Sequence, residues 1–168
     1  YYSSFPLHMM GTNSTHREVM WVANMSGQAI ARNTNFVSFG HIYTRHGPRT
    51  ELCIYESVAA LLGIMASGYH PAFMAAASGG RLNQSNPLDV HLVAEVALAT
   101  IGMSRQKANE LCLEFLELYE DTLLPDQDFG KTFPELYDVK TRQPLPETVE
   151  HYKRMKDELA DIGIPFTS

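Results

Sequence analysis

The sequence predicts an α/β protein with a small parallel sheet, built from successive units of a strand followed by a helix. The clearest unit spans residues 36–68. Phe36–Phe39 is short, aromatic and β-branched, which suits a buried strand, and a helical pattern runs from Thr50 to Gly68. The same order of strand and helix recurs before and after this unit. Consecutive units of this kind form parallel strands with right-handed crossovers, so three units predict one parallel sheet.

Composition narrows the class of protein. The chain has 168 residues, 45% of them hydrophobic and 19% charged, which is typical of one soluble globular core. A net charge of −6 opposes binding to nucleic acid or to an anionic membrane surface, so we expect neither partner. No apolar run reaches the roughly 18 residues of a membrane span. Cys53 and Cys112 fall within helical patterns and are expected as buried free thiols in a cytoplasmic protein.

The first and third units are weaker in sequence. The apolar run Phe5–Met10 is expected as a short strand, followed by a polar loop and a helix over Arg17–Arg32. Tyr69–Ala77 is expected as the third strand, with Pro71 near its start, and residues 78–85 as its loop.

Three helix starts carry strong local signals. Thr50 precedes Glu51, whose charge suits the positive end of a helix dipole. Asn86 is followed by proline, and that helix is expected to stop at Gly102. Ser104 caps the next helix. Its expected apolar stripe contains Ala108, Leu111, Cys112, Phe115, Leu118 and Tyr119.

The chain changes character after Pro125. Residues 126–146 show little periodicity and are expected as an ordered, extended arm. A final helix is expected over Pro146–Ile162, ended by Gly163. The sequence therefore divides into a β/α part at 1–124, with three units and an extra helix, and an arm with a final helix at 125–168.

The arm carries a resemblance to a known family. Residues 130–166 resemble the carboxyl terminus of the monomethylamine:corrinoid methyltransferases, through Gly130-Lys131-Thr132-Phe133, Glu135 and Tyr137-Asp138-Val139-Lys140-Thr141. Earlier segments are similar to the same family: Pro6, His8, Arg17-Glu18, Gly47-Pro48, Thr50-Glu51, Cys53, Glu95-Val96-Ala97, Ala99-Thr100 and Gly102-Met103. The match covers nearly all of this chain but only about the last third or more of a family member.

The resemblance implies a (β/α)8 TIM barrel, of which this chain supplies the last three β/α units and the carboxyl-terminal helices. It implies methyl transfer from monomethylamine, or a related methylated amine, to a corrinoid carried by a partner protein, with no cofactor bound directly. The family's pyrrolysine lies upstream of the stretch present here. The missing barrel strands are expected from upstream residues, from another chain or from a homo-oligomer. The competing interpretation is a non-catalytic partial barrel that acts as a binding or assembly module.

The resemblance also implies two catalytic positions after the family's seventh strand. Tyr43 matches the family's tyrosine, and His41 stands where the family has glutamine. The two share a side if the extended backbone continues through them. His41 is a candidate proton acceptor near neutral pH, or only fills the glutamine site. Tyr43 is a candidate amine ligand, or only a packing residue whose hydroxyl finds a neighbour.

Three further residues are candidates for binding substrate or corrinoid. His8 is expected either in the pocket or as a satisfied core histidine. Arg45 and His46 are expected to contact the phosphate and amide groups of a corrinoid, the alternative being solvated loop cations. The spacing of the histidines fits no zinc motif and no cysteine joins them, so no metal site is expected.

Overall fold

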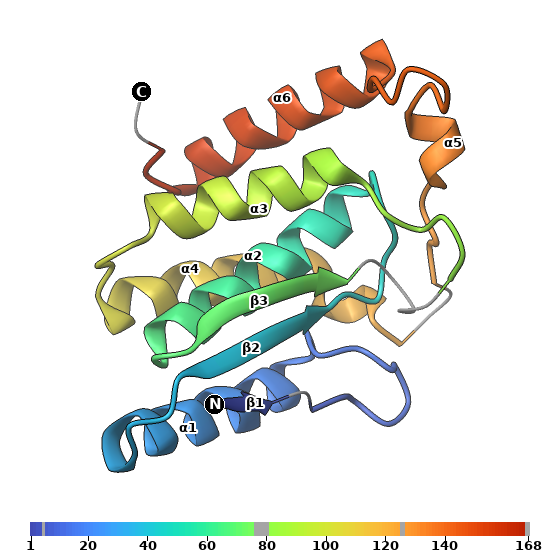
Figure 1. Ribbon diagram of the computed structural model, residues 1–168. Helices are drawn as coiled ribbons and strands as arrows, with labels where there is room; N and C mark the ends of the chain where they lie inside the picture. The colour runs from blue at the N-terminus through green and yellow to red at the C-terminus, as the bar shows by residue number, and fades with distance from the viewer. Residues whose placement is uncertain (5, 76–80, 125–126, 167–168) are drawn as a thin grey trace.

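The computed structural model describes residues 1–4, 6–75, 81–124 and 127–166, and its strands form one parallel sheet in the order β1-β2-β3 (Figure 1). The strands are β1 (Tyr2–Ser4), β2 (Ser38–Tyr43) and β3 (His70–Ala75). Both neighbouring pairs are parallel. The predicted succession of β/α units with parallel strands is therefore confirmed.

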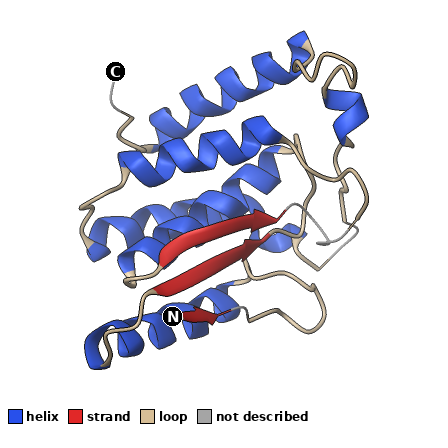
Figure 2. Ribbon diagram, in the orientation of Figure 1, coloured by secondary structure: helices blue, strands red, loops and turns tan. Residues whose placement is uncertain are grey.

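Helices cover one face of this sheet and leave the other open, as Figure 2 shows with the strands in front of the helices. The helices are α1 (Arg17–Asn33), α2 (Glu51–Ala66), α3 (Pro87–Ala99), α4 (Arg105–Tyr119), α5 (Phe133–Leu136) and α6 (Pro146–Ile162), with a 3₁₀ turn at Glu120–Thr122. No helix in the described ranges combines the length and apolar character that a membrane crossing requires.

Helix α2 lies at the centre of the core. Every residue from 53 to 62 in this helix is buried. Its neighbours in the core include Ile42 of β2, Phe115 of α4 and Met155 of α6, each at most 2% exposed. Burial of each such large apolar side chain contributes about 1.5–3 kcal/mol, so the packing around this helix stabilises the fold substantially.

The predicted caps are confirmed. The side chains of Thr50, Asn86 and Ser104 each accept a hydrogen bond from a backbone N–H in the first turn of α2, α3 and α4. Helix α3 ends at Ala99, earlier than predicted, and Gly102 in the following turn has a φ of +80°. The prediction that Leu118 belongs to the buried stripe of α4 is wrong, because this residue is 45% exposed.

The prediction of a strand at Phe5–Met10 is wrong. Strand β1 lies just before it, where the Tyr2 N–H donates to the Val37 carbonyl at 2.9 Å. Met9 and Met10 are 97% and 79% exposed in the loop that follows. A strand requires pairing with a neighbouring strand, and no strand pairs with the described residues of this apolar run.

Strand β2 starts later and continues further than predicted. Phe36 and Val37 are more than half exposed and precede it. Gly40 lies inside the strand. A Cβ there would meet the Ile64 side chain of α2 at 2.8 Å, so glycine permits close packing of the helix on the strand. The extension carries β2 through Tyr43.

Strand β3 ends at Ala75, and residues 76–80 of the predicted third strand and its loop lie outside the described residues.

The arm is ordered by the rest of the chain, and it is not wholly extended. It contains α5, which begins with a capping box between Thr132 and Glu135. Before α5, the Gly47 N–H donates to the Asp128 carbonyl at 2.8 Å and the Lys131 N–H donates to the Pro48 carbonyl at 3.0 Å. The arm therefore crosses the loop that leads into α2 at close backbone distance.

Candidate functional site

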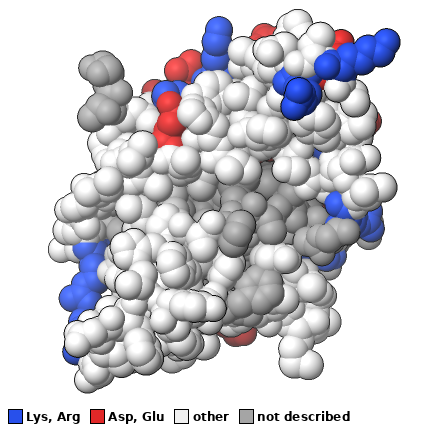
Figure 3. Space-filling view, viewed as in Figure 1, with Lys and Arg blue, Asp and Glu red and all other residues white. Residues whose placement is uncertain are grey.

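The carboxyl ends of the strands, with the open face of the sheet beside them, form the candidate site. Along β2, Ser38, Gly40 and Ile42 are buried, and Gly40 faces α2. His41 and Tyr43 alternate with them and are half-buried on the other side. In Figure 3, which views the molecule as in Figure 1, Lys, Arg, Asp and Glu lie near the outline and the described surface in the middle is uncharged. The two predicted catalytic residues thus share the side of β2 that no helix covers.

His41 is held by the neighbouring strand. Its Nε2 lies 2.5 Å from the Ser3 hydroxyl oxygen in β1. His41 also borders a hollow of about 20 Å³ between the sheet and the helices, whose lining includes residues of α1 and α2. A serine hydroxyl either donates to or accepts from an imidazole nitrogen, so Ser3 orients the His41 ring in either tautomer. Sequence reasoning missed Ser3, which has no motif of its own.

Tyr43 is anchored through its backbone. The Tyr43 N–H donates to the Ser14 hydroxyl and the Ser14 N–H donates to the Tyr43 carbonyl, both at 2.8 Å. The loop between β1 and α1 is thereby joined to the end of β2. This loop also contains His8, whose Nδ1 accepts from the Gly11 N–H at 3.2 Å and whose ring stacks on His16.

A buried carboxylate organises the loop after β2. Glu56 of α2 is 0% exposed. It accepts hydrogen bonds from the Arg45 N–H at 2.6 Å and the His46 N–H at 2.9 Å. The His46 Nδ1 lies 2.8 Å from its Oε1, and the Thr15 hydroxyl also donates to it. One side chain therefore joins the loops that follow β1 and β2.

This arrangement gives Arg45 and His46 partners within the chain. His46 is 2% exposed and paired with Glu56. The Arg45 guanidinium is half-buried, and its Nη1 donates to the Gly11 carbonyl at 3.3 Å and to the Gln127 side-chain oxygen at 3.0 Å. Their placement favours a structural role, in which both side chains hold the loops in position, rather than the predicted contact with a corrinoid.

Sequence reasoning did not find Glu56. The available signal was a single carboxylate within the apolar segment of α2, at residues 53–62. A glutamate in a helical segment with no solvent-exposed face is buried, and a fully buried glutamate is almost always paired. Its partners lie in two loops that are distant in sequence, so the sequence did not predict them.

A second buried carboxylate supports the start of α2. Asp89 of α3 is 3% exposed and accepts from the Arg49 N–H at 2.9 Å. Burial raises the pKa of Asp89 to about 6, against the opposing effect of the Arg49 N–H. Arg49 has a φ of +63°, in the left-handed region that non-glycine residues seldom adopt. The hydrogen bond to Asp89 helps to hold this conformation.

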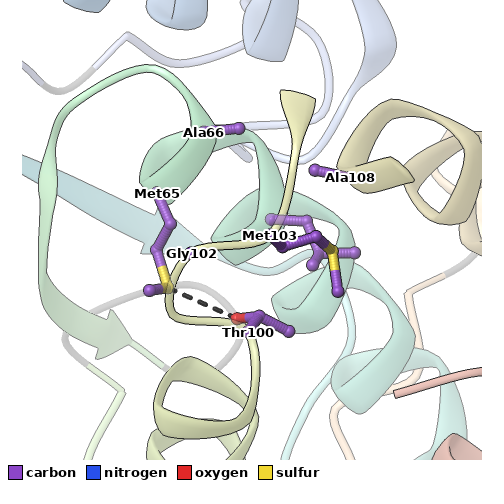
Figure 4. A pocket seen from close by; sticks show the side chains of 7 residues that line it. Met65, Ala66, Thr100, Gly102, Met103 and Ala108 are labelled. Atoms are coloured by element: carbon purple, nitrogen blue, oxygen red, sulfur yellow. Dashed lines mark hydrogen bonds between the residues drawn. The ribbon is translucent and has the colours of Figure 1, made fainter. Parts of the chain in front are cut away.

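Other hollows lie away from the strand ends. A space of about 60 Å³ is lined by residues that include Met65, Thr100 and Met103, and the Thr100 hydroxyl donates to the Met65 sulfur at 3.6 Å (Figure 4). These residues lie at the carboxyl ends of α2 and α3, on the side of the molecule where the strands begin. A groove of about 460 Å³ separates α1 from α4 on the helical side. In parallel β/α sheets, ligand sites form at the carboxyl ends of the strands, so neither hollow is the leading candidate.

Comparisons with known proteins agree with the arrangement of elements. A family model described as "Monomethylamine methyltransferase MtmB" matches residues 1–164. The monomethylamine methyltransferase MtmB of Methanosarcina mazei is 31% identical over 162 residues, which are 96% of this chain and 35% of the relative. MtmB1 of Methanosarcina barkeri is 30% identical over the same shares of the two chains.

The solved structures give the same correspondence. The crystal structure of Methanosarcina barkeri MtmB superposes with a TM-score of 0.91 at 29% identity, covering 99% of this chain and 36% of that chain. A structure of the hydroxylamine complex of MtmB matches equally. The chain thus spans about a third of the length of these relatives. On the family match and the two superpositions, this chain belongs to the monomethylamine methyltransferase MtmB family.

Proposed function

We propose that this chain is the carboxyl-terminal portion of a methyltransferase that moves a methyl group from monomethylamine, or a related methylated amine, to a corrinoid protein. The family match over residues 1–164 is the observation that carries the proposal. Because the relatives are almost three times longer, the three strands are proposed as one wall of a (β/α)8 barrel. The other strands come from residues or chains outside this sequence.

The proposed substrate wall is the open side of β2. Both His41 and Tyr43 lie there, at the end of the strands where barrels carry chemistry. A tyrosine hydroxyl is suited to hold a small amine, and a neutral imidazole is suited to accept its proton. One similar structure contains hydroxylamine, a molecule of comparable size. These properties support a pocket for a small, polar nitrogen compound.

The corrinoid supplies the methyl acceptor when its carrier protein docks. The residues described here do not form a cradle for it, because His46 is buried and the Arg45 guanidinium is engaged by Gly11 and Gln127. His8, Arg45 and His46 are proposed to shape the loops around the substrate, while the surface that receives the carrier lies elsewhere on the complete barrel.

Methyl transfer to a corrinoid tests the proposal, using the protein together with whatever completes its barrel. Tyr43→Phe is expected to lower the rate about tenfold or more, through loss of one hydrogen bond to the amine. Tyr152→Phe is the matched control. It removes a hydroxyl that donates to Glu95 at 2.6 Å, between α6 and α3, and is expected to leave the rate unchanged.

His41→Gln separates the substrate assignment from the acid–base role. If His41 accepts a proton, the change is expected to lower the rate about a hundredfold. A higher rate with methylamine would contradict the acid–base role and support the substrate, because glutamine is the residue expected there in the family. The absence of methyl transfer from any methylated amine by the complete protein would favour the non-catalytic module instead.

A further inference from the structure

We propose that His8, His16 and Glu18 form a binding site for a divalent transition-metal ion such as Zn²⁺. One potential ligand atom from each of the three side chains lies within 4.8 Å of the other two. The imidazole rings of His8 and His16 are nearly parallel, with centroids 4.3 Å apart and an interplanar angle of 16°. The proposal is independent of the methyltransferase assignment.

The local fold brings these residues together. The His8 N–H donates to the Asn13 carbonyl and the Thr12 N–H donates to the His8 carbonyl, both at 2.8 Å, which folds the loop back on itself. Asn13 is 0% exposed, and its side-chain oxygen accepts from the His16 N–H at 3.0 Å. The turn thus places His8 over the first residue before α1. This juxtaposition depends on the turn, so no sequence spacing typical of zinc sites reveals it.

The ligand set suits a borderline metal ion. Two imidazoles and a carboxylate are the protein ligands of open zinc sites, in which water or a small ligand takes the fourth position. Mg²⁺ and Ca²⁺ prefer oxygen ligands and are poorly matched to two imidazoles. Tetrahedral coordination at ordinary Zn–N distances brings ligand atoms to about 3.3 Å from one another, so side chains up to 4.8 Å apart must close by up to about 1.5 Å. Glu18 is exposed in the first turn of α1 and has room to do so.

The cation adjacent in sequence to two of the ligands is already paired. Arg17 lies between two of the ligands in sequence, but its guanidinium pairs with Glu120, with Nη2 and Oε2 2.6 Å apart. The pair carries no net charge, and Glu18 adds a negative charge beside the two rings. The carboxylate of Glu18 therefore favours a divalent cation, although the Arg45 guanidinium, which donates to the Gly11 carbonyl at 3.3 Å, adds one positive charge to the same loop.

Coordination changes the hydrogen bonding of the two rings. The His8 Nδ1 accepts from the Gly11 N–H at 3.2 Å, and the His16 Nδ1 accepts from the Glu18 N–H at 3.4 Å. In the neutral rings the proton is then on Nε2, so coordination through Nε2 moves it to Nδ1 and gives up both contacts. Both contacts are long, hence weak beside a metal–nitrogen bond. Metal binding is therefore expected to rearrange the loop around Gly11.

Direct binding of Zn²⁺ and Co²⁺ to the untagged protein, in its native assembly, tests the site. We expect one Zn²⁺ per chain and the visible spectrum of tetrahedral Co²⁺, with no displacement of Zn²⁺ by excess Mg²⁺. His8→Asn, His16→Asn and Glu18→Gln should each weaken Zn²⁺ binding at least about tenfold. Asparagine is a strong helix N-cap, so His16→Asn removes a ligand and keeps the cap of α1.

His91→Asn is the matched control, because His91 is an exposed histidine of α3. It should bind Zn²⁺ as the unmodified protein does, and circular dichroism should show that every variant keeps its helix content. The proposal is overturned if the unmodified protein binds less than one Zn²⁺ per chain. It is equally overturned if Glu18→Gln and His16→Asn, both folded, bind as tightly as the unmodified protein, or if His91→Asn loses as much affinity as they do.

Discussion

At the scale of single residues, Glu56 is the side chain that joins the loops at the carboxyl ends of β1 and β2. Its carboxylate receives two backbone N–H groups, one imidazole and one hydroxyl in a fully buried position. Glu56→Gln keeps the size but replaces one acceptor oxygen by a donor. The donors that face the replaced oxygen then lose their acceptor without access to water.

We expect Glu56→Gln to lower the free energy of unfolding by about 3 kcal/mol, as when one partner of a buried ion pair is removed. Urea unfolding at a fixed protein concentration measures this change. Glu117→Gln, on the exposed face of α4, is the matched control and should change stability by less than about 0.5 kcal/mol. Equal effects of the two substitutions would show that Glu56 does not hold the loops.

Asp89 predicts a pH dependence of stability. Its pKa is raised to about 6 in the folded protein from an ordinary value of 3.8, so the folded state binds more protons between these values. Stability contributed by the protonated form is therefore lost as the pH rises from about 4 to about 6, by about 3 kcal/mol in total. Asp89→Asn keeps an oxygen acceptor for the Arg49 N–H and removes this loss.

The measurement is the difference in unfolding free energy between Asp89→Asn and the unmodified protein, followed across this pH range. The difference should shift in favour of the variant as the pH rises, and then remain constant above about pH 7. A difference that does not change with pH would contradict the raised pKa. Comparison with the variant cancels the contribution of His151, whose pKa is lowered to about 4 by burial and by the nearby Arg154 and Arg49.

At the scale of elements, the crossing of the arm over the loop before α2 explains two glycines of the family-like motifs. A Cβ on Gly47 would lie 1.8 Å from the Phe129 carbonyl oxygen, and a Cβ on Gly130 would lie 2.1 Å from the Pro48 carbonyl oxygen. Both obstacles are backbone atoms, which cannot move aside cheaply. The crossing therefore requires glycine on both segments.

Gly130→Ala and Gly102→Ala separate steric overlap from backbone strain. Gly130 and Gly102 have φ values of +62° and +80°, but a Cβ on Gly102 would meet no atom within 4 Å. Gly102→Ala should lower the unfolding free energy by about 1–2 kcal/mol, the cost of the left-handed conformation alone. Gly130→Ala should cost more than this, because the arm must separate from the loop. Thermal unfolding compares the two, and equal losses would argue against a tight crossing.

The elements also show what the sequence could reveal. The starts of α2, α3 and α4 were predictable because Thr50, Asn86 and Ser104 act on backbone groups within the next three residues. Strand β1 was not, because its existence depends on pairing with β2. The side shared by His41 and Tyr43 followed from strand alternation. The links from Glu56 to Thr15 and from Ser3 to His41 join residues about 40 positions apart, and no local pattern encodes them.

At the scale of the whole molecule, the open sheet is the feature that most needs a partner. Within the described residues, the outer edges of β1 and β3 have no neighbouring strand. The open face exposes part of Phe39, His41 and Tyr43, and Figure 3 shows little charge on the described surface at the middle of the view. Unpaired edges and an uncharged face favour association with further strands. This agrees with a chain that spans about 35% of its relatives.

Sedimentation of the purified 168-residue chain, combined with thermal unfolding, tests this conclusion most directly. If the sheet is one wall of a barrel, the isolated chain should self-associate or fail to unfold cooperatively, and a segment supplying the missing β/α units should convert it into a defined, cooperatively folding complex. A monodisperse monomer of 18.8 kDa with a sharp cooperative melting transition would contradict the incomplete barrel.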